Sequence, residues 1–167
     1  NVSVTYPGGV EALKDLNLEI NDGDFIIIVG LSGAGKSTLL RTVNNLVKPS
    51  TGSVYLENKN VTSAKKRELK QIRSQIGMIF QTFNLVNRST VLKNVLTGRL
   101  SNISTFRSIL GLWPKEQKQM AFEALNQVEI LEKAYVRASN LSGGQQQRVG
   151  IARALSQKPK VMLADEP

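Results

Sequence analysis

The stretch "FIIIVGLSGAGKSTLLRTVNNLV" constrains the fold more than any other part of the chain. Residues 25–30 form a continuous, largely β-branched apolar run, which is typical of a strand buried on both faces of a parallel or mixed sheet. A glycine-rich turn follows, and apolar residues then recur at helical spacing until "KPSTG" ends the pattern: Leu39, Leu40, Val43, Leu46 and Val47. The stretch therefore predicts a strand, a turn and a helix in immediate succession, which favours an α/β domain.

Other segments extend this pattern. Strands are predicted for "VSVTY", "LNLEI", "SVYLE", "IGMIF" and "VMLAD". From about Thr82 to Asn140, helical periodicity replaces the β-branched runs. The apolar face of "KEQKQMAFEALNQVEIL" consists of Met120, Ala121, Ala124, Leu125, Val128 and Leu131. The segment "SGGQQQRVGIARALSQ" predicts a further helix, with Ser142 as its N-cap.

These patterns predict one α/β domain, a mixed sheet with helices and an inserted α-helical subdomain. A chain of 167 residues has the length of one ordinary domain. We expect residues 1–81 to form the core, which contains the glycine-rich turn and an antiparallel β region, and residues 82–140 to form the helical subdomain. Residues 141–167 are expected to return to the core as a helix and a strand.

The turn "GLSGAGKS" matches G-x-x-x-x-G-K-[ST], the pattern of a loop that holds nucleotide phosphates. Glycines let backbone N–H groups face phosphate oxygens, and the following helix directs its unsatisfied N–H groups and positive dipole end to the same anion. Lys36 is expected to reach the β- and γ-phosphates and to assist catalysis, and the Ser37 hydroxyl is expected to bind Mg²⁺. The predicted nucleotide-binding residues of this loop are Gly30, Ser32, Gly33, Ala34, Gly35, Lys36, Ser37 and Thr38.

The chain ends in "KVMLADEP", where two adjacent carboxylates follow an apolar strand pattern. Such carboxylates repel each other and need a cation or a chemical task. Phosphate-loop enzymes use a carboxylate at the end of a second strand to hold Mg²⁺. Asp165 is therefore predicted to bind the metal, and Glu166 is predicted to act as the general base that polarises the attacking water.

Charge and missing residue types narrow the alternatives. The chain carries 22 Lys and Arg against 13 Asp and Glu, a formal charge of +9, which suits phosphate ligands, an acidic membrane surface or a polyanion. Its densest basic segment, "KNVTSAKKRELKQIR", has no interleaved aromatic residues, which weakens an interpretation as a nucleic-acid stacking surface. Cysteine and histidine are both absent, so thiolate or imidazole metal sites and a histidine base are excluded.

The segment "LSGGQQQR", residues 141–148, distinguishes this chain from other phosphate-loop proteins. It resembles the signature sequence of ABC-type ATPases, and the resemblance covers essentially all 167 residues. Physically the segment is a second anion receptor, made of a serine hydroxyl, two glycines and a helix N-terminus. The resemblance makes its nucleotide-contacting residues Ser142, Gly143, Gly144 and Gln145.

The resemblance also implies ligands and partners. ATP and Mg²⁺ would be bound in a head-to-tail homodimer, in which Ser142–Gln145 of one subunit cover the ATP of the other. Tyr6 matches the aromatic residue that stacks on adenine. Gln81 matches the glutamine loop, which contacts Mg²⁺ and water, takes part in catalysis and joins the core to the helical subdomain. Permease subunits in the membrane would dock on that subdomain, and a periplasmic or lipoprotein solute-binding protein would act indirectly. The expected location is the cytoplasmic face of the membrane, with no nucleic-acid partner.

Within the family, the segment around "LSNISTFRSILGLWP" resembles the ATP-binding subunits of bacterial phosphonate importers. This implies ATP hydrolysis coupled to uptake of phosphonate or a related organophosphorus or oxyanion solute. Three alternatives stay open: an importer ATPase for another solute, a soluble ABC ATPase that acts on nucleic acid or ribosomes, and a nucleotide-binding module without turnover. Phosphate-loop kinases are disfavoured, because "LSGGQ" has no place in them.

The family pattern continues beyond the acidic pair with an aspartate loop and a histidine that contacts the γ-phosphate, and this chain has neither. It also begins without Met, at a residue that usually lies inside the first strand. We therefore expect a fragment, truncated at both ends and without the C-terminal part of the fold. Such a fragment would bind ATP weakly and hydrolyse it poorly.

Overall fold

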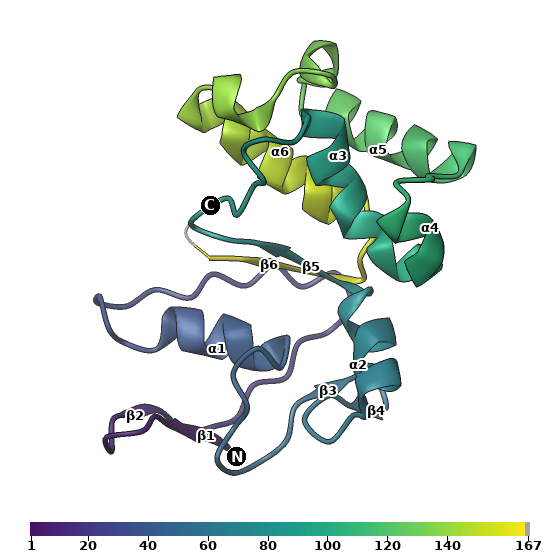
Figure 1. Cartoon of the computed structure of the whole chain (residues 1–167). Coiled ribbons are helices and arrows are strands. Elements are labelled where there is room, and N and C mark those ends of the chain that lie inside the picture. The colour runs from purple at the N-terminus through teal and green to yellow at the C-terminus, as the bar shows by residue number, and fades with distance from the viewer. Residues whose placement is uncertain (166–167) are drawn as a thin grey trace. The chain divides into compact units, whose positions relative to one another are not determined.

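The computed structural model describes residues 1–165 of the chain (Figure 1). The chain divides into two compact units, Asn1–Ile72 and Arg73–Pro167, and each is described by itself. The described strands form three two-stranded sheets, two of them antiparallel and one parallel. Strands and helices are thus both present, as the predicted α/β class requires.

The first unit contains two antiparallel strand pairs and the helix that follows the glycine-rich loop. Its elements are β1 (Val2–Thr5), β2 (Glu11–Leu16), α1 (Lys36–Val43), β3 (Tyr55–Leu56), β4 (Lys59–Asn60) and the start of α2 (Lys66–Arg73). β1 pairs with β2 in a register that places Val4 opposite Leu13, and both side chains are buried. Gly8 and Gly9 turn the chain between them at positive φ, which glycine adopts without steric cost. The strand predicted at "VSVTY" is confirmed.

Two strands predicted in this unit are wrong. Residues 17–20 and 25–30 lie outside any strand. The side chains of Phe25, Ile27 and Val29 are 89%, 72% and 88% exposed. A strand requires backbone hydrogen bonds to a neighbour, and none joins the apolar run to another segment within residues 1–165. The β-branched pattern indicates that the segment favours extended, buried backbone. A strand forms only if a neighbouring strand also provides the backbone hydrogen bonds.

Two further elements are shorter than predicted. β3 covers only Tyr55–Leu56 of "SVYLE". Helix α1 ends at Val43, before the last apolar residues of its pattern. Asn45 has a φ of 50°, a left-handed conformation that commonly ends helices. Its side-chain amide donates a hydrogen bond of 2.9 Å to the carbonyl oxygen of Val61, which holds this helix end in place.

The second unit combines one parallel strand pair with a group of helices. Its elements are β5 (Ile76–Ile79), α3 (Val91–Leu96), the 3-10 helix η1 (Thr97–Asn102), α4 (Thr105–Ile109), α5 (Lys115–Gln127), η2 (Leu131–Lys133), η3 (Ala138–Asn140), α6 (Gly143–Leu155) and β6 (Val161–Ala164). β5 and β6 run parallel, with Ile76 beside Val161 and Ile79 beside Ala164. Every residue of β5 is buried, as expected for a parallel strand. The strands predicted at "IGMIF" and "VMLAD" are confirmed.

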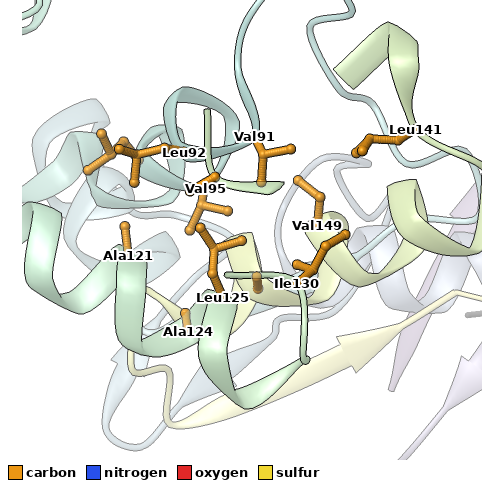
Figure 2. Packing of buried hydrophobic residues seen from close by; sticks show 12 residues of the cluster. Val91, Leu92, Val95, Ala121, Ala124, Leu125, Ile130, Leu141 and Val149 are labelled. Atoms are coloured by element: carbon orange, nitrogen blue, oxygen red, sulfur yellow. The ribbon is translucent and has the colours of Figure 1, made fainter. Parts of the chain in front are cut away.

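Helices α3, α5 and α6 enclose the apolar core of the second unit (Figure 2). The buried cluster consists of Val91, Leu92, Val95, Leu96, Ala121, Ala124, Leu125, Ile130, Ala134, Leu141, Val149 and Ala152. The predicted apolar face of α5 is confirmed for Ala121, Ala124 and Leu125, which are at most 3% exposed. Leu131 lies in η2 and is 39% exposed, because α5 ends at Gln127 and its periodicity stops there. This packing holds α6 in place, with Val149 and Ala152 in the buried cluster.

Candidate functional site

The glycine-rich loop of the first unit is built around the start of α1. Gly35 is the N-cap of α1 with a φ of 90°, and its carbonyl oxygen accepts a hydrogen bond of 2.8 Å from the Leu39 N–H. A Cβ atom at Gly35 would overlap the carbonyl oxygen of Ala12, so the position excludes any side chain. Gly33 also has positive φ, at 83°, but a Cβ there would meet no atom within 4 Å. The two glycines are therefore needed for different reasons, close packing in one case and backbone conformation in the other.

Lys36 folds back over this loop. Its Nζ donates hydrogen bonds of 2.7 Å to the Gly30 carbonyl oxygen and 3.0 Å to the Leu31 carbonyl oxygen. The ammonium group thus lies beside the loop backbone, next to the N-terminal end of α1 with its unsatisfied N–H groups. Ser32, Gly33 and Ala34 are exposed. This arrangement is suited to binding an anionic ligand, because a cation and a helix N-terminus attract the same negative charge.

Tyr6 is brought to the same place by the β1–β2 hairpin. Its hydroxyl lies 3.2 Å from Oγ1 of Thr38, on the first turn of α1. The ring is 37% exposed, so one part of it remains accessible. The sequence predicted both residues as nucleotide contacts from separate motifs, and the structure joins them by a hydrogen bond. Ser37 is half-buried on the same turn.

Gln81 and Asp165 lie at one edge of the parallel pair in the second unit. β5 ends at Ile79 and β6 at Ala164, residues that face each other in the ladder. The Asp165 N–H donates a hydrogen bond of 3.0 Å to the Ile79 carbonyl oxygen, and the residue is 4% exposed. Carboxyl ends of parallel strands carry ligand-binding residues in α/β proteins. Both residues therefore lie at the carboxyl end of the parallel strand pair. Glu166 lies outside the described residues.

The predicted signature residues form the N-terminus of α6. Ser142 is the N-cap, and its Oγ accepts a hydrogen bond of 3.4 Å from the Gln145 N–H. The Gln145 Oε1 in turn accepts one of 3.0 Å from the Ser142 N–H, which completes a capping box. A Cβ at Gly143 or Gly144 would meet no atom within 4 Å, so the backbone of this turn is open to a ligand.

An open hollow of about 380 Å³ adjoins this helix start, lined by Glu129, Ile130, Glu132, Ser142, Gly144, Gln145 and Arg148. Arg148 donates hydrogen bonds to the Val128 and Glu129 carbonyl oxygens, and a guanidinium nitrogen lies 3.6 Å from the Glu129 carboxylate. The sequence analysis missed these charged residues. Nothing in their local pattern distinguishes them, because the path of the chain between α5 and α6 brings them to the hollow.

Clusters of metal-binding side chains and helices that could span a membrane are both absent from the described part of the chain. Within residues 1–165 no group of three or more His, Cys, Asp or Glu side chains could hold a metal ion. No helix in the described part of the chain is long and apolar enough to cross a membrane.

Comparison with known proteins decides the family. The profile of the ABC transporter family matches residues 13–167, a range that includes the glycine-rich loop, the "LSGGQQQR" segment and the terminal acidic pair. The chain belongs to the ABC transporter family. The resemblance drawn from these motifs is thereby confirmed.

Its relatives within the ABC transporter family include importer subunits. The chain is 55% identical over 167 residues to the phosphonates import ATP-binding protein PhnC 3 of Halalkalibacterium halodurans. It is 59% identical over the same length to the phosphonates import ATP-binding protein PhnC of Bacillus thuringiensis subsp. konkukian. In both comparisons all of the chain is aligned, and it spans 65% of the length of the relative.

Solved structures confirm the ABC cassette fold. The dimeric post-hydrolysis state of the ATP-binding cassette MJ0796 bound to ADP and Pi is 40% identical, with a TM-score of 0.87 over 100% of this chain and 72% of that one. A nucleotide-free ATP-binding cassette from an ABC transporter is 34% identical, with a TM-score of 0.81 over 100% of this chain and 67% of that one.

Proposed function

We propose that this chain is the ATP-binding and ATP-hydrolysing part of a bacterial ABC importer for phosphonate or a related organophosphorus or oxyanion solute. The observation that carries the proposal is the glycine-rich loop, where Gly35 opens α1 and the Lys36 ammonium lies beside the loop carbonyls. A polyphosphate here would replace those carbonyls as the partner of Lys36 and would accept N–H groups from the start of α1. The solute is inferred from the PhnC relatives, which are 55% and 59% identical.

The remaining nucleotide contacts follow from the same placement. Tyr6 would stack on the adenine, with its hydroxyl held at Thr38. Ser142, Gly143, Gly144 and Gln145 would cover the ATP bound to a second copy of the chain. A capped helix start with open glycines is suited to this task, because its N–H groups can approach a terminal phosphate. The dimeric cassette bound to ADP and Pi supports a head-to-tail dimer.

Mg²⁺ fits the oxygen donors that the chain offers. We assign it to the Ser37 hydroxyl, the Gln81 amide oxygen and the Asp165 carboxylate, since hard oxygen ligands suit this ion. Asp165 is 4% exposed, and a buried carboxylate is stabilised by a nearby cation. Bound Mg²⁺ would neutralise charge on the phosphate oxygens. Lys36 would hold the β- and γ-phosphates, Gln81 would orient the attacking water, and Glu166 would take its proton as general base.

The proposal includes an organisation in three parts. Residues 1–81 and 141–167 would form the nucleotide-binding core, and residues 82–140 would form the helical subdomain. Permease subunits would dock on that subdomain at the cytoplasmic face of the membrane, and a solute-binding protein would act through them. Closure of the dimer on ATP would then move the permease as a rigid body.

Titration of the chain with a fluorescent ATP analogue in the presence of Mg²⁺ tests the part of the proposal that concerns nucleotide binding. We expect Lys36→Met to weaken binding at least tenfold, because the phosphates lose their cation. Lys118→Met, which removes the same charge from the exposed surface of α5, is the control and should bind like wild type. Equal affinities for all three proteins would contradict the proposal.

Growth on a phosphonate as the sole phosphorus source tests the solute. Disruption of the gene should abolish growth on phosphonate and leave growth on inorganic phosphate unchanged. Normal growth on both sources, despite ATP binding in vitro, would assign the ATPase to a different solute or to a soluble partner.

A further inference from the structure

Arg153, near the end of α6, is joined to the loop that follows Gln81. Its Nη2 donates a hydrogen bond of 2.7 Å to the Phe83 carbonyl oxygen, and its Nη1 donates one of 2.8 Å to the Asn84 carbonyl oxygen. The planar guanidinium thus binds two successive carbonyls at once, a geometry that a lysine cannot reproduce. Two hydrogen bonds of this kind fix both the position and the direction of the loop backbone.

The surroundings of Arg153 show that the two loop carbonyls take the place of water around its guanidinium. The residue is half-buried, and burial lowers the pKa of its guanidinium from the ordinary value. Among residues 1–165 no carboxylate pairs with it. A charge removed from water needs compensation. At Arg153 the compensation comes from the two loop carbonyls, together with the favourable position of a cation in the last turn of a helix.

The loop itself has a conformation that needs support. Asn84 has a φ of 50°, in the left-handed region that a non-glycine residue rarely adopts. Its side-chain Oδ1 accepts a hydrogen bond of 3.4 Å from the Thr82 hydroxyl. Phe83 lies against Gly150, where an added Cβ would be 4.0 Å from the Phe83 Cβ. Gly150 and Arg153 share one face of α6, so the loop rests on that face and is held there by the arginine.

We propose that Arg153 is a positioning residue that couples the glutamine loop to the signature helix. The inference rests on the proposed function, in which Gln81 contacts Mg²⁺ and Ser142 contacts the ATP of a second copy. Arg153 lies eleven positions after Ser142, the N-cap of α6, which corresponds to about 17 Å at about 1.5 Å per residue. A movement of α6 when Ser142 engages nucleotide is then transmitted through Arg153 to Phe83 and Asn84, two and three positions beyond Gln81.

The C-terminal end of the loop, at Val86, is held by a residue other than Arg153. The effect of Arg153 on the rest of the loop can therefore be measured separately. The buried side chain of Asn94 accepts a hydrogen bond of 2.7 Å from the Val86 N–H and donates one of 3.2 Å to the Val86 carbonyl oxygen. These contacts tie the loop to α3, not to α6. Loss of Arg153 therefore loosens residues 82–84, while Leu85, which packs against the buried cluster, and Val86 stay in place.

Arg99→Met supplies a matched control. Arg99 is also a buried arginine that binds backbone carbonyls, with hydrogen bonds of 2.9 Å to Ser156 and 3.2 Å to Gln157. Burial lowers its pKa as well. These two carbonyls follow the end of α6, and a third partner, Gln117 Oε1 at 2.8 Å, lies on α5. None of the three lies in the glutamine loop, so loss of Arg99 should lower stability without loosening residues 82–84.

The experiment measures limited digestion of the whole chain by chymotrypsin, with the cleavage sites identified by mass spectrometry, and its affinity for ATP with Mg²⁺ and with EDTA. In Arg153→Met we expect cleavage after Phe83 to become about tenfold faster, with a smaller rise in Arg153→Lys and none in Arg99→Met. Arg153→Met should also lose most of the gain in ATP affinity that Mg²⁺ provides, while its affinity in EDTA stays at the wild-type value.

The outcomes separate the two proposals. If Arg153→Met does not fold, Arg153→Lys against Arg99→Met carries the comparison. Unchanged cleavage after Phe83 in the Arg153 variants, or an equal rise in Arg99→Met, overturns the coupling. The coupling is also overturned if Arg153→Met keeps the gain in ATP affinity that Mg²⁺ provides. A wild-type chain that fails to bind ATP under either condition overturns the proposed function and with it the coupling, and the cleavage data then show only a structural contact.

Discussion

The hydroxyl of Tyr6 lies 3.2 Å from Oγ1 of Thr38, which joins the first hairpin to the first turn of α1. Thirty-two positions of sequence separate the two residues. Tyr6 leaves part of its ring accessible beside the loop that contains Lys36. The hydrogen bond holds an aromatic residue beside the first turn of α1, and the proposed function gives the ring of that residue the task of stacking on adenine.

Substitutions of Tyr6 should separate these two functions. Tyr6→Phe keeps the ring and loses one hydrogen bond, worth about 0.5–1.5 kcal/mol. We therefore expect its ATP affinity to fall less than about tenfold. Tyr6→Ala also loses stacking, worth about 1–3 kcal/mol, and should weaken ATP binding by a further tenfold or more. Titration with a fluorescent ATP analogue checks both values. Equal losses in the two variants would show that the ring does not contact the base.

Alanine at the two loop glycines should have unequal effects. At Gly35 the new Cβ would overlap the Ala12 carbonyl oxygen, so β2 or the start of α1 must shift. We expect a loss of more than about 2 kcal/mol in the free energy of unfolding, together with loss of ATP binding. At Gly33 the space is free, and only the left-handed backbone is unfavourable, by about 1–2 kcal/mol. Urea denaturation of the two variants gives the comparison, and a larger loss at Gly33 would contradict the packing argument.

Leu125 should be the most sensitive single position in the core of the second unit. It belongs to α5, is 0% exposed and is a member of the buried cluster of Figure 2, together with residues of α3 and α6. Leu125→Ala should lower the free energy of unfolding by about 2–5 kcal/mol, since it creates a cavity. Leu112→Ala is a matched control: Leu112 is 57% exposed, and the change should cost less than about 0.5 kcal/mol. Chemical denaturation followed by circular dichroism measures both, and similar values would show that the cluster does not hold the unit together.

Ser142 should contribute to stability even without nucleotide. Its side chain caps α6, and replacement of such a cap by alanine costs about 0.5–2 kcal/mol. Ser142→Ala should therefore lower the melting temperature of the chain in the absence of ATP. Ser139→Ala removes a hydroxyl that donates to the Asn140 side chain and caps no helix, so it should melt like wild type. An unchanged melting temperature in Ser142→Ala would mean that the capping box is dispensable.

The exposed apolar run at residues 25–29 should make the chain self-associate. Phe25 and Val29 are 89% and 88% exposed, and within residues 1–165 no backbone hydrogen bond joins the run to another segment. Such segments pair with other chains. Replacement of Ile27 and Val29 by lysine should lower the average mass measured by light scattering and should reduce binding of the dye ANS. A wild-type chain that stays monomeric at high concentration would contradict this expectation.

Patterns within a few residues determined much of the candidate site. The spacing of Gly30, Gly35, Lys36 and Ser37 predicts the loop and the helix behind it, because turn geometry and helix initiation depend on neighbouring residues. The serine and glutamine of "LSGGQ" predict the capped start of α6 for the same reason. The face of α5 follows from helical periodicity alone.

Only the tertiary structure decided which distant segments meet. Nothing near Tyr6 or Thr38 predicts their hydrogen bond, and nothing near Arg153 predicts that it holds Phe83 and Asn84. The apolar run at 25–30 reads locally as a buried strand, yet it has no ladder within residues 1–165. The physical reason is the same in each case. The local sequence determines which backbone conformation a segment favours, whereas its hydrogen-bond partners and its burial are provided by residues far away in the chain.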